Sequence, residues 1–324
     1  MSADPAVEHG HQGEPPTVGA RGSVRVWAGV ALVLLSTVIY GSTPALVTFV
    51  RGDVSVVDLI AYRAALAALM FLALARLVGV WSGRRRLRSA SRPVRAVLVG
   101  ASLWGPQFLL YYASFEYIDT SLAVAIGFVY PTVVLILVAA TERQRPAPVE
   151  IALSLLALLG IAALLLPGGD AGVHPLGVCL ALLAACGYAV YVLLADRLLQ
   201  DVEPFELGAQ ISLGATICAV AVGLVLQRMS VLTDPRDLVV VGAQAVLMVV
   251  ATGCYYGGLM RLGSSQASLV DTAQPVVALA AGGLLLGESM VAVQVAGVVV
   301  VTASVALSSV LTHRRATVPY ADPP

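Results

Sequence analysis

The sequence predicts an all-α integral membrane protein with ten transmembrane helices, arranged as two inverted five-helix repeats. Three observations predict this fold class. Hydrophobic residues make up 59% of the 324 residues and charged residues only 12%, with a mean hydropathy of +0.90, which lies far from the composition of soluble globular domains. Apolar segments occupy most of the chain, and its two halves share a residue pattern.

The apolar segments are each long enough to cross a hydrocarbon core, which takes about 20 helical residues. We expect ten such spans, at residues 26–49, 56–80, 94–115, 119–141, 148–167, 175–199, 204–227, 237–260, 264–286 and 289–312. The first is too long for the apolar part of a signal peptide, and another span follows almost at once, so we expect it to be retained.

All 19 basic residues are arginines, and their distribution orients the spans. With the N-terminus in the cytoplasm, fourteen arginines fall in cytoplasmic segments, and only Arg51, Arg228 and Arg236 fall in outer loops. This excess is the positive-inside pattern. It predicts a multi-pass protein of the cell (plasma) membrane with both termini in the cytoplasm.

The two halves repeat at an offset of 148 residues between positions 29–61 and 177–209. Further along, YYASFEYIDTSLAVAIGFVYP (111–131) aligns without gaps on YYGGLMRLGSSQASLVDTAQP (255–275). Chance matches of Leu and Ala are expected in so apolar a chain, but paired tyrosines and prolines at one spacing are not. The chain therefore contains an internal duplication.

Five helices per repeat is an odd number, so the second copy must enter the membrane from the opposite side. We expect residues 1–25 to be a disordered cytoplasmic tail, 26–167 the first repeat, 168–312 the second repeat and 313–324 a cytoplasmic C-terminal tail. Inverted repeats are typical of transporters that alternate between inward-open and outward-open states around a site near the membrane midplane.

Polar side chains inside the spans are the candidate functional residues, because their burial in hydrocarbon is costly unless they face a cavity or a partner. Asp271 lies well inside the span 264–286 and aligns with Gly127 of the first half. Either its carboxylate loads a proton or meets a cationic substrate group, or it is a buried acid held for packing.

Two prolines at aligned positions, Pro131 and Pro275, are expected to kink their helices. Each lacks the N–H that would bond the carbonyl four residues earlier, which frees the carbonyls of Gly127 and Asp271. These kinks either line a cavity or are the ordinary kinks that membrane helices tolerate.

Arg63 lies inside the second span and has no basic counterpart in the second half. Either its guanidinium binds a substrate carboxylate or phosphate through two hydrogen bonds, or its long stem lets the charge reach the outer interface. Tyrosines and glutamines in mid-helix complete the predicted substrate and proton pathway, namely Tyr40, Tyr112, Tyr188, Tyr256, Gln210 and Gln274.

Other kinds of chemistry find no support in the sequence. The four cysteines have no CxxC spacing and the four histidines fall in the tails or a loop, so we expect no metal site and no cofactor. No nucleophile motif or phosphate-binding glycine loop is present, so no catalytic residues and no enzyme activity are expected. Most of the arginines lie near the ends of apolar segments, which leaves no basic surface for nucleic acid.

Together these features resemble the drug/metabolite transporter superfamily, EamA type, over residues 26–312. The matching residues are Tyr40-Gly41-Ser42, Arg63, Tyr111 and Tyr112, Pro131, and QPVVALAAGGLLLGE from Gln274 to Glu288. The resemblance implies ten helices as two inverted repeats around a central cavity, and a secondary transporter that exports small metabolites such as amino acids, or toxic compounds. The halves depart from symmetry, since the second lacks the arginine of the first.

The sequence therefore predicts a secondary active transporter that exports a small metabolite or toxic organic solute by alternating access, with proton coupling as one option. The alternatives are an exchanger or uptake carrier, a lipid flippase, and a non-transporting binding or sensor protein of the same fold. Its expected partners are a small-molecule substrate and the lipid bilayer. Neither the substrate nor the oligomeric state follows from these residues.

Overall fold

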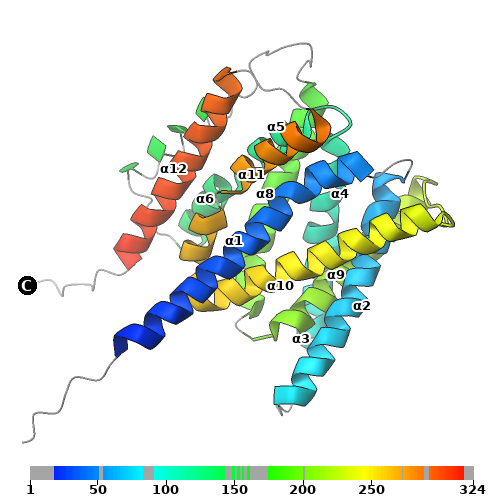
Figure 1. Ribbon diagram of the computed structural model, residues 1–324, viewed down its shortest axis with the longest axis horizontal. Coiled ribbons are helices and arrows are strands. Elements are labelled where there is room, and N and C mark those ends of the chain that lie inside the picture. The colour runs from blue at the N-terminus through cyan, green and yellow to red at the C-terminus, as the bar shows by residue number, and fades with distance from the viewer. Residues whose placement is uncertain are drawn as a thin grey trace, which may run out of the picture.

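The computed structural model describes residues 18–50, 54–82, 91–142, 148–149, 152–153, 155–156, 159–160, 174–199, 201–271, 273–287 and 292–316. Every regular element in these ranges is a helix (Figure 1). The α-helices are α1 (Val18–Val50), α2 (Val56–Ser82), α3 (Ser91–Val99), α4 (Gly105–Ser114), α5 (Thr120–Gly127), α6 (Tyr130–Glu142), α8 (Pro175–Leu199), α9 (Pro204–Val225), α10 (Pro235–Asp271), α11 (Gln274–Ala281) and α12 (Ala292–Ala316). Two π-helical turns, Gly100–Trp104 and Gly282–Leu286, continue α3 and α11.

Six helical segments in the described ranges are long and apolar enough to cross a membrane, namely Val26–Val47, Val56–Gly79, Val94–Ser114, Pro175–Leu199, Pro204–Val225 and Pro235–Leu262. Their outward faces carry large exposed apolar side chains such as Leu69, which is 64% exposed, as expected of a surface that contacts lipid. The predicted count of ten is not confirmed. Span 119–141 is divided between α5 and α6, and most of span 148–167 lies outside the described residues.

Two predicted boundaries differ from the structure. We expected a loop at residues 261–263, but α10 runs unbroken from Pro235 to Asp271, about 55 Å at 1.5 Å per residue. No proline interrupts that stretch, and the Arg261 guanidinium bonds the carbonyl of Gly257 one turn back. The first span was predicted to begin at residue 26, and α1 begins earlier, at Val18, while its apolar membrane-crossing part is Val26–Val47.

Helices of the first half pack on helices of the second. α1 lies along α10 and α2 along α9, so each half contributes to the same core. The closest approach joins the α3 region to α9: a Cβ on Gly214 would lie 2.1 Å from the carbonyl oxygen of Val97, and one on Gly100 would lie 2.2 Å from that of Ile211. Only glycine permits helices to come this near.

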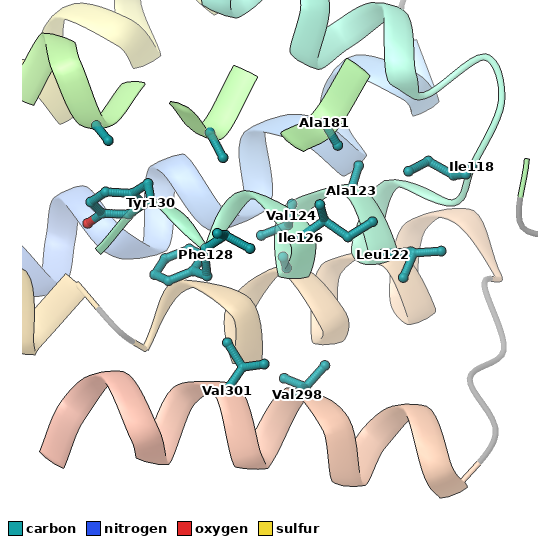
Figure 2. Close-up of a cluster of buried hydrophobic side chains, with 14 residues drawn as sticks. Ile118, Leu122, Ala123, Val124, Ile126, Phe128, Tyr130, Ala181, Val298 and Val301 are labelled. Carbon is teal, nitrogen blue, oxygen red and sulfur yellow. The ribbon is translucent and has the colours of Figure 1, made fainter. Parts of the chain in front are cut away.

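A second region of tight packing surrounds α5. Ile118, Leu122, Val124, Ile126 and Phe128 belong to a buried apolar cluster that also contains Ala181 of α8 and Val298 and Val301 of α12. Figure 2 shows the two α12 valines pointing toward the helices above them, with the α5 side chains beyond. This cluster fixes α5, and therefore the break that follows it, inside the protein.

Both halves interrupt a helix at aligned positions. α5 ends at Gly127 and α6 begins at Tyr130, while α10 ends at Asp271 and α11 begins at Gln274. The second residue of each following helix is a proline, Pro131 or Pro275, where the missing N–H would have had no helical partner. Short breaks thus stand where we expected kinks in continuous helices.

The same helix cap also recurs at the repeat offset. In the first half the Asp58 N–H donates to the Ser55 hydroxyl at 3.1 Å, and in the second half the Glu206 N–H donates to the Glu203 carboxylate at 2.9 Å. Positions 55 and 203, like 58 and 206, are related by the offset of 148 found in the sequence. Side-chain caps of this kind satisfy backbone donors at a helix start.

Candidate functional site

A cavity with about 100 Å³ of free volume lies between the two halves. That volume holds several water molecules or a small organic solute. Helices α1, α2, α4, α5, α6, α8, α10 and α11 and the π-helical turn before α4 contribute its lining, which consists of Tyr40, Thr43, Pro44, Arg63, Trp104, Gln107, Phe108, Tyr111, Tyr112, Val124, Gly127, Phe128, Tyr130, Ala184, Ala185, Tyr188, Gln244, Met248 and Gln274. Aromatic side chains predominate, with a few polar groups among them, as is usual for sites that bind small molecules.

One helical face supplies the aromatic wall of the cavity. Trp104, Gln107, Phe108, Tyr111 and Tyr112 follow one another at intervals of three, one, three and one residues, which places them on the same side of a helix. The π-helical turn ending at Trp104 lies next to Pro106, whose missing N–H loosens the helical hydrogen bonding there. Trp104 and Phe108 meet edge to face, with centroids 4.7 Å apart.

Arg63 points from α2 into this wall and is only 3% exposed. One of its terminal nitrogens donates to the Tyr112 hydroxyl at 2.9 Å. Its guanidinium carbon lies 4.5 Å from the centroid of the Phe108 ring and 4.9 Å from that of Tyr112. The Nε–H is buried and has no hydrogen-bond partner within the described residues. The guanidinium is therefore held by aromatic rings in a residue that lines the cavity, and one of its N–H donors is unused within the described residues.

Asp271, the last residue of α10, is 4% exposed but is not part of the cavity lining. It accepts a hydrogen bond from the Thr37 hydroxyl of α1 at 2.9 Å, and the side chain of Tyr130 adjoins the same carboxylate. Tyr130 does line the cavity. The carboxylate thus lies one side chain away from the cavity and is held by protein groups from two other helices.

Tyrosines from both halves complete the polar surroundings of the cavity. The hydroxyl of Tyr40 is hydrogen-bonded to that of Thr252 on α10. Tyr188 packs against Tyr130, with ring centroids 4.8 Å apart, and the Tyr191 and Tyr256 hydroxyls bond each other at 2.9 Å. Gly41 lets α1 approach α11, because a Cβ there would lie 2.8 Å from the Cβ of Val277.

Of the residues predicted for the substrate and proton pathway, the cavity brings together Arg63, Tyr40, Tyr112, Tyr188 and Gln274. Asp271 adjoins Tyr130, which lines the cavity, whereas Tyr256 is bonded to Tyr191 and neither of these two tyrosines is part of the lining. Gln210 and Pro275 are absent from the lining, and the side chain of Pro131 lies outside what the structure describes.

The lining also contains aromatic and amide residues that were not among those predictions, including Trp104, Gln107, Phe108, Tyr130 and Gln244. Four of these five carry polar groups within predicted spans, and the rule that selected Arg63 and Asp271 would have selected them as well. The spacing of the aromatic and amide residues between 104 and 112 is a second signal present in the sequence alone.

In the first turn of α2, a buried carboxylate joins the two halves. Asp58 is 1% exposed, and its oxygens accept from the Ser55 hydroxyl at 2.9 Å, the Ser230 N–H at 3.1 Å and the Ser230 hydroxyl at 2.6 Å. The Tyr62 hydroxyl donates to the Ser230 carbonyl at 3.0 Å. Ser230 lies in the connection between α9 and α10, so these bonds tie that connection to α2.

Comparison with known proteins agrees with this architecture. The model of the EamA-like transporter family matches residues 27–166 and again residues 175–310. The chain belongs to the EamA-like transporter family. Two matches in succession support the division of the chain into two duplicated halves. Membership also makes it a multi-pass membrane transporter rather than an enzyme.

Individual relatives extend this result. The chain is 29% identical over 308 residues to the threonine/homoserine exporter RhtA of Salmonella typhimurium, covering 92% of this chain and 96% of that protein. It is 26% identical over 251 residues to an uncharacterized transporter of Synechocystis sp., covering 74% of each. A crystal structure with 18% identity superposes with a TM-score of 0.62 over 91% of this chain and 99% of the other. The last likeness concerns the fold alone.

Proposed function

We propose that this EamA-family transporter exports small amino-acid-like solutes, with Arg63 binding the substrate carboxylate. The observation that carries the proposal is the buried guanidinium of Arg63, a residue that lines the cavity and whose Nε–H has no hydrogen-bond partner among the described residues. A buried cation is costly unless it is paired, and a carboxylate is a geometric match for a guanidinium fork. The similarity to a threonine/homoserine exporter supports the same substrate class.

The two halves, residues 26–167 and 168–312, would supply the movement. We propose that they form inverted repeats, with both termini in the cytoplasm, that exchange conformations around the cavity in the cell membrane. The recurring caps at residues 55–58 and 203–206 and the aligned helix breaks support such a pseudo-symmetry. Substrate binding would change the relative stability of the two states only if its affinity differs between them.

Counterflow in proteoliposomes tests the substrate class. Vesicles preloaded with unlabelled L-threonine should accumulate external labelled L-threonine when they contain the wild-type protein. The same vesicles with Arg63→Gln should lose at least about nine-tenths of the initial rate, since a hydrogen bond to a charged group contributes about 1.5–3 kcal/mol. Absence of amino acid counterflow by the wild type, or equal rates for both proteins, would contradict the proposal.

Proton coupling is assigned to Asp271, because this carboxylate adjoins the cavity through Tyr130 without lining it. In Asp271→Asn the side chain can still accept from Thr37, but it cannot take up a proton. We expect counterflow without a pH gradient to continue, while substrate accumulation driven by an imposed pH gradient is lost. A variant that still accumulates substrate in response to the gradient would remove Asp271 from the coupling step.

A further inference from the structure

Beyond Arg63, side chains that line the cavity carry a second group of polar atoms that the protein does not satisfy. Both amide atoms of Gln244, the indole Nε1–H of Trp104 and the amide oxygen of Gln107 are buried and lack hydrogen-bond partners within the described residues. All three side chains line the cavity. Most buried polar groups in proteins are hydrogen-bonded, so several exceptions around one cavity indicate a ligand that completes them.

Gln244 is the most confined of the three. It is 1% exposed, and it is among the largest side chains that are fully buried in the described part of the chain. Leaving a buried donor or acceptor unsatisfied costs about 1–3 kcal/mol, and the amide of Gln244 leaves both kinds of group unused. Its neighbour one turn along α10 is the apolar Met248, which also lines the cavity.

The three side chains with unpaired polar atoms come from different helices around the cavity. Gln244 comes from α10 of the second half, whereas Trp104 and Gln107 come from the aromatic face of the first half. Arg63 and Trp104 are both in contact with the ring of Phe108. A small solute anchored at Arg63 therefore also meets polar groups that carry no charge.

We infer that Gln244 determines specificity by hydrogen-bonding a hydroxyl or carboxamide on the substrate side chain. The inference rests on the proposed function, in which Arg63 holds the carboxylate. A carboxamide donates and accepts at once, so its complement is a group that also does both, and hydroxyl and amide groups do so. An aliphatic side chain of equal size leaves the Gln244 amide unpaired, which makes the site reject it.

Two amino acids of nearly equal shape test this inference. L-threonine and L-valine differ by a hydroxyl in place of a methyl group, so their relative initial rates of counterflow report recognition of that hydroxyl. Wild-type proteoliposomes should carry threonine in preference to valine by at least about tenfold. In Gln244→Leu the two rates should become about equal, because the rate for threonine drops while the rate for valine is kept or rises.

Two further variants keep the test decisive. Gln244→Met preserves the length of the side chain and replaces Gln244→Leu if that protein is not recovered folded. Gln210→Leu removes a glutamine from α9 whose buried oxygen also lacks a partner in the described residues but which does not line the cavity. It should leave the threonine-to-valine ratio near its wild-type value.

The outcomes separate the two levels of the proposal. If the wild type carries neither amino acid, the proposed function fails and this inference falls with it. If the wild type carries amino acids but does not prefer threonine, or if the preference survives in both Gln244 variants, the specificity role of Gln244 is overturned while the proposed function stands. A ratio that collapses in Gln244→Leu and in Gln210→Leu alike also overturns it, because the effect is then not confined to the cavity.

Discussion

Helix α2 carries two buried charged residues, Asp58 and Arg63, whose surroundings are opposite. They are five positions apart and are 1% and 3% exposed, so burial does not distinguish them. The Asp58 carboxylate accepts three hydrogen bonds from two serines. Arg63 has the hydroxyl of Tyr112 as its partner, and its Nε–H has none within the described residues.

The difference separates a structural charge from a binding one. The bonds of Asp58 are internal and link the two halves, so any ligand would have to displace them. Arg63 lines the cavity and keeps an N–H donor that the protein leaves unpaired within the described residues, so an anion that reaches this donor gains a hydrogen bond without displacing an internal one. Asp271 lies between these cases, since Thr37 and Tyr130 hold it, but Tyr130 borders the cavity.

The largest effect should come from substitutions of Arg63. We expect Arg63→Gln to raise the dissociation constant for L-threonine by about 30- to 150-fold, equivalent to about 2–3 kcal/mol. Arg63→Lys should raise it by a smaller factor, because an ammonium keeps the charge but lacks the planar fork. Ligand-induced shifts in melting temperature in detergent measure both. If Gln and Lys variants bind as tightly as the wild type, Arg63 belongs with Asp58 as a structural charge.

Asp58→Ala should show the reverse pattern. Loss of the carboxylate leaves the Ser230 N–H and two serine hydroxyls without their acceptor, so the free energy of unfolding should fall by about 2 kcal/mol. The affinity for the substrate should change by less than about twofold. Denaturant unfolding in micelles, followed by the same ligand titration, measures both quantities. A large loss of affinity with unchanged stability would assign Asp58 to substrate binding and remove the contrast with Arg63.

The sequence predicted Arg63 more easily than its surroundings. An isolated charge in an apolar span is evident from its sequence neighbours alone. The repeat that relates Tyr40 to Tyr188 is likewise evident from matching residues at a fixed offset. Which polar groups are already paired does not appear in a one-dimensional pattern, because Ser230, which bonds Asp58, and Thr37, which bonds Asp271, are 172 and 234 residues away from them along the chain. Tyr256 and Gln210 were chosen by the same rule as Tyr188 and Gln274, yet they do not line the cavity.

Helix boundaries show the same limit in the fold. The span at 175–199 coincides with α8, where His174 and Pro175 mark the start. By contrast, the Arg261-Leu262-Gly263 stretch is polar enough to read as a loop but contains nothing that forbids a helix, and in the structure it is helical and packs against α1 at Gly29. The aligned segment of the first half does turn after α4, with the Tyr117 N–H bonding the Ser114 carbonyl at 3.0 Å.

The smallest expected effect is that of Tyr62→Phe, which removes one hydroxyl beside the Asp58 bonds. The Tyr62 hydroxyl donates to the Ser230 carbonyl, an acceptor that water can replace because this bond is exposed. We therefore expect a loss of about 0.5 kcal/mol or less in the free energy of unfolding, against about 2 kcal/mol for Asp58→Ala. Measuring the two variants and their double mutant in one denaturant series tests this ranking. If Tyr62→Phe lowers the free energy of unfolding as much as Asp58→Ala does, the whole hydrogen-bond network holds the connection between α9 and α10. The buried carboxylate alone would then not account for the link between the halves.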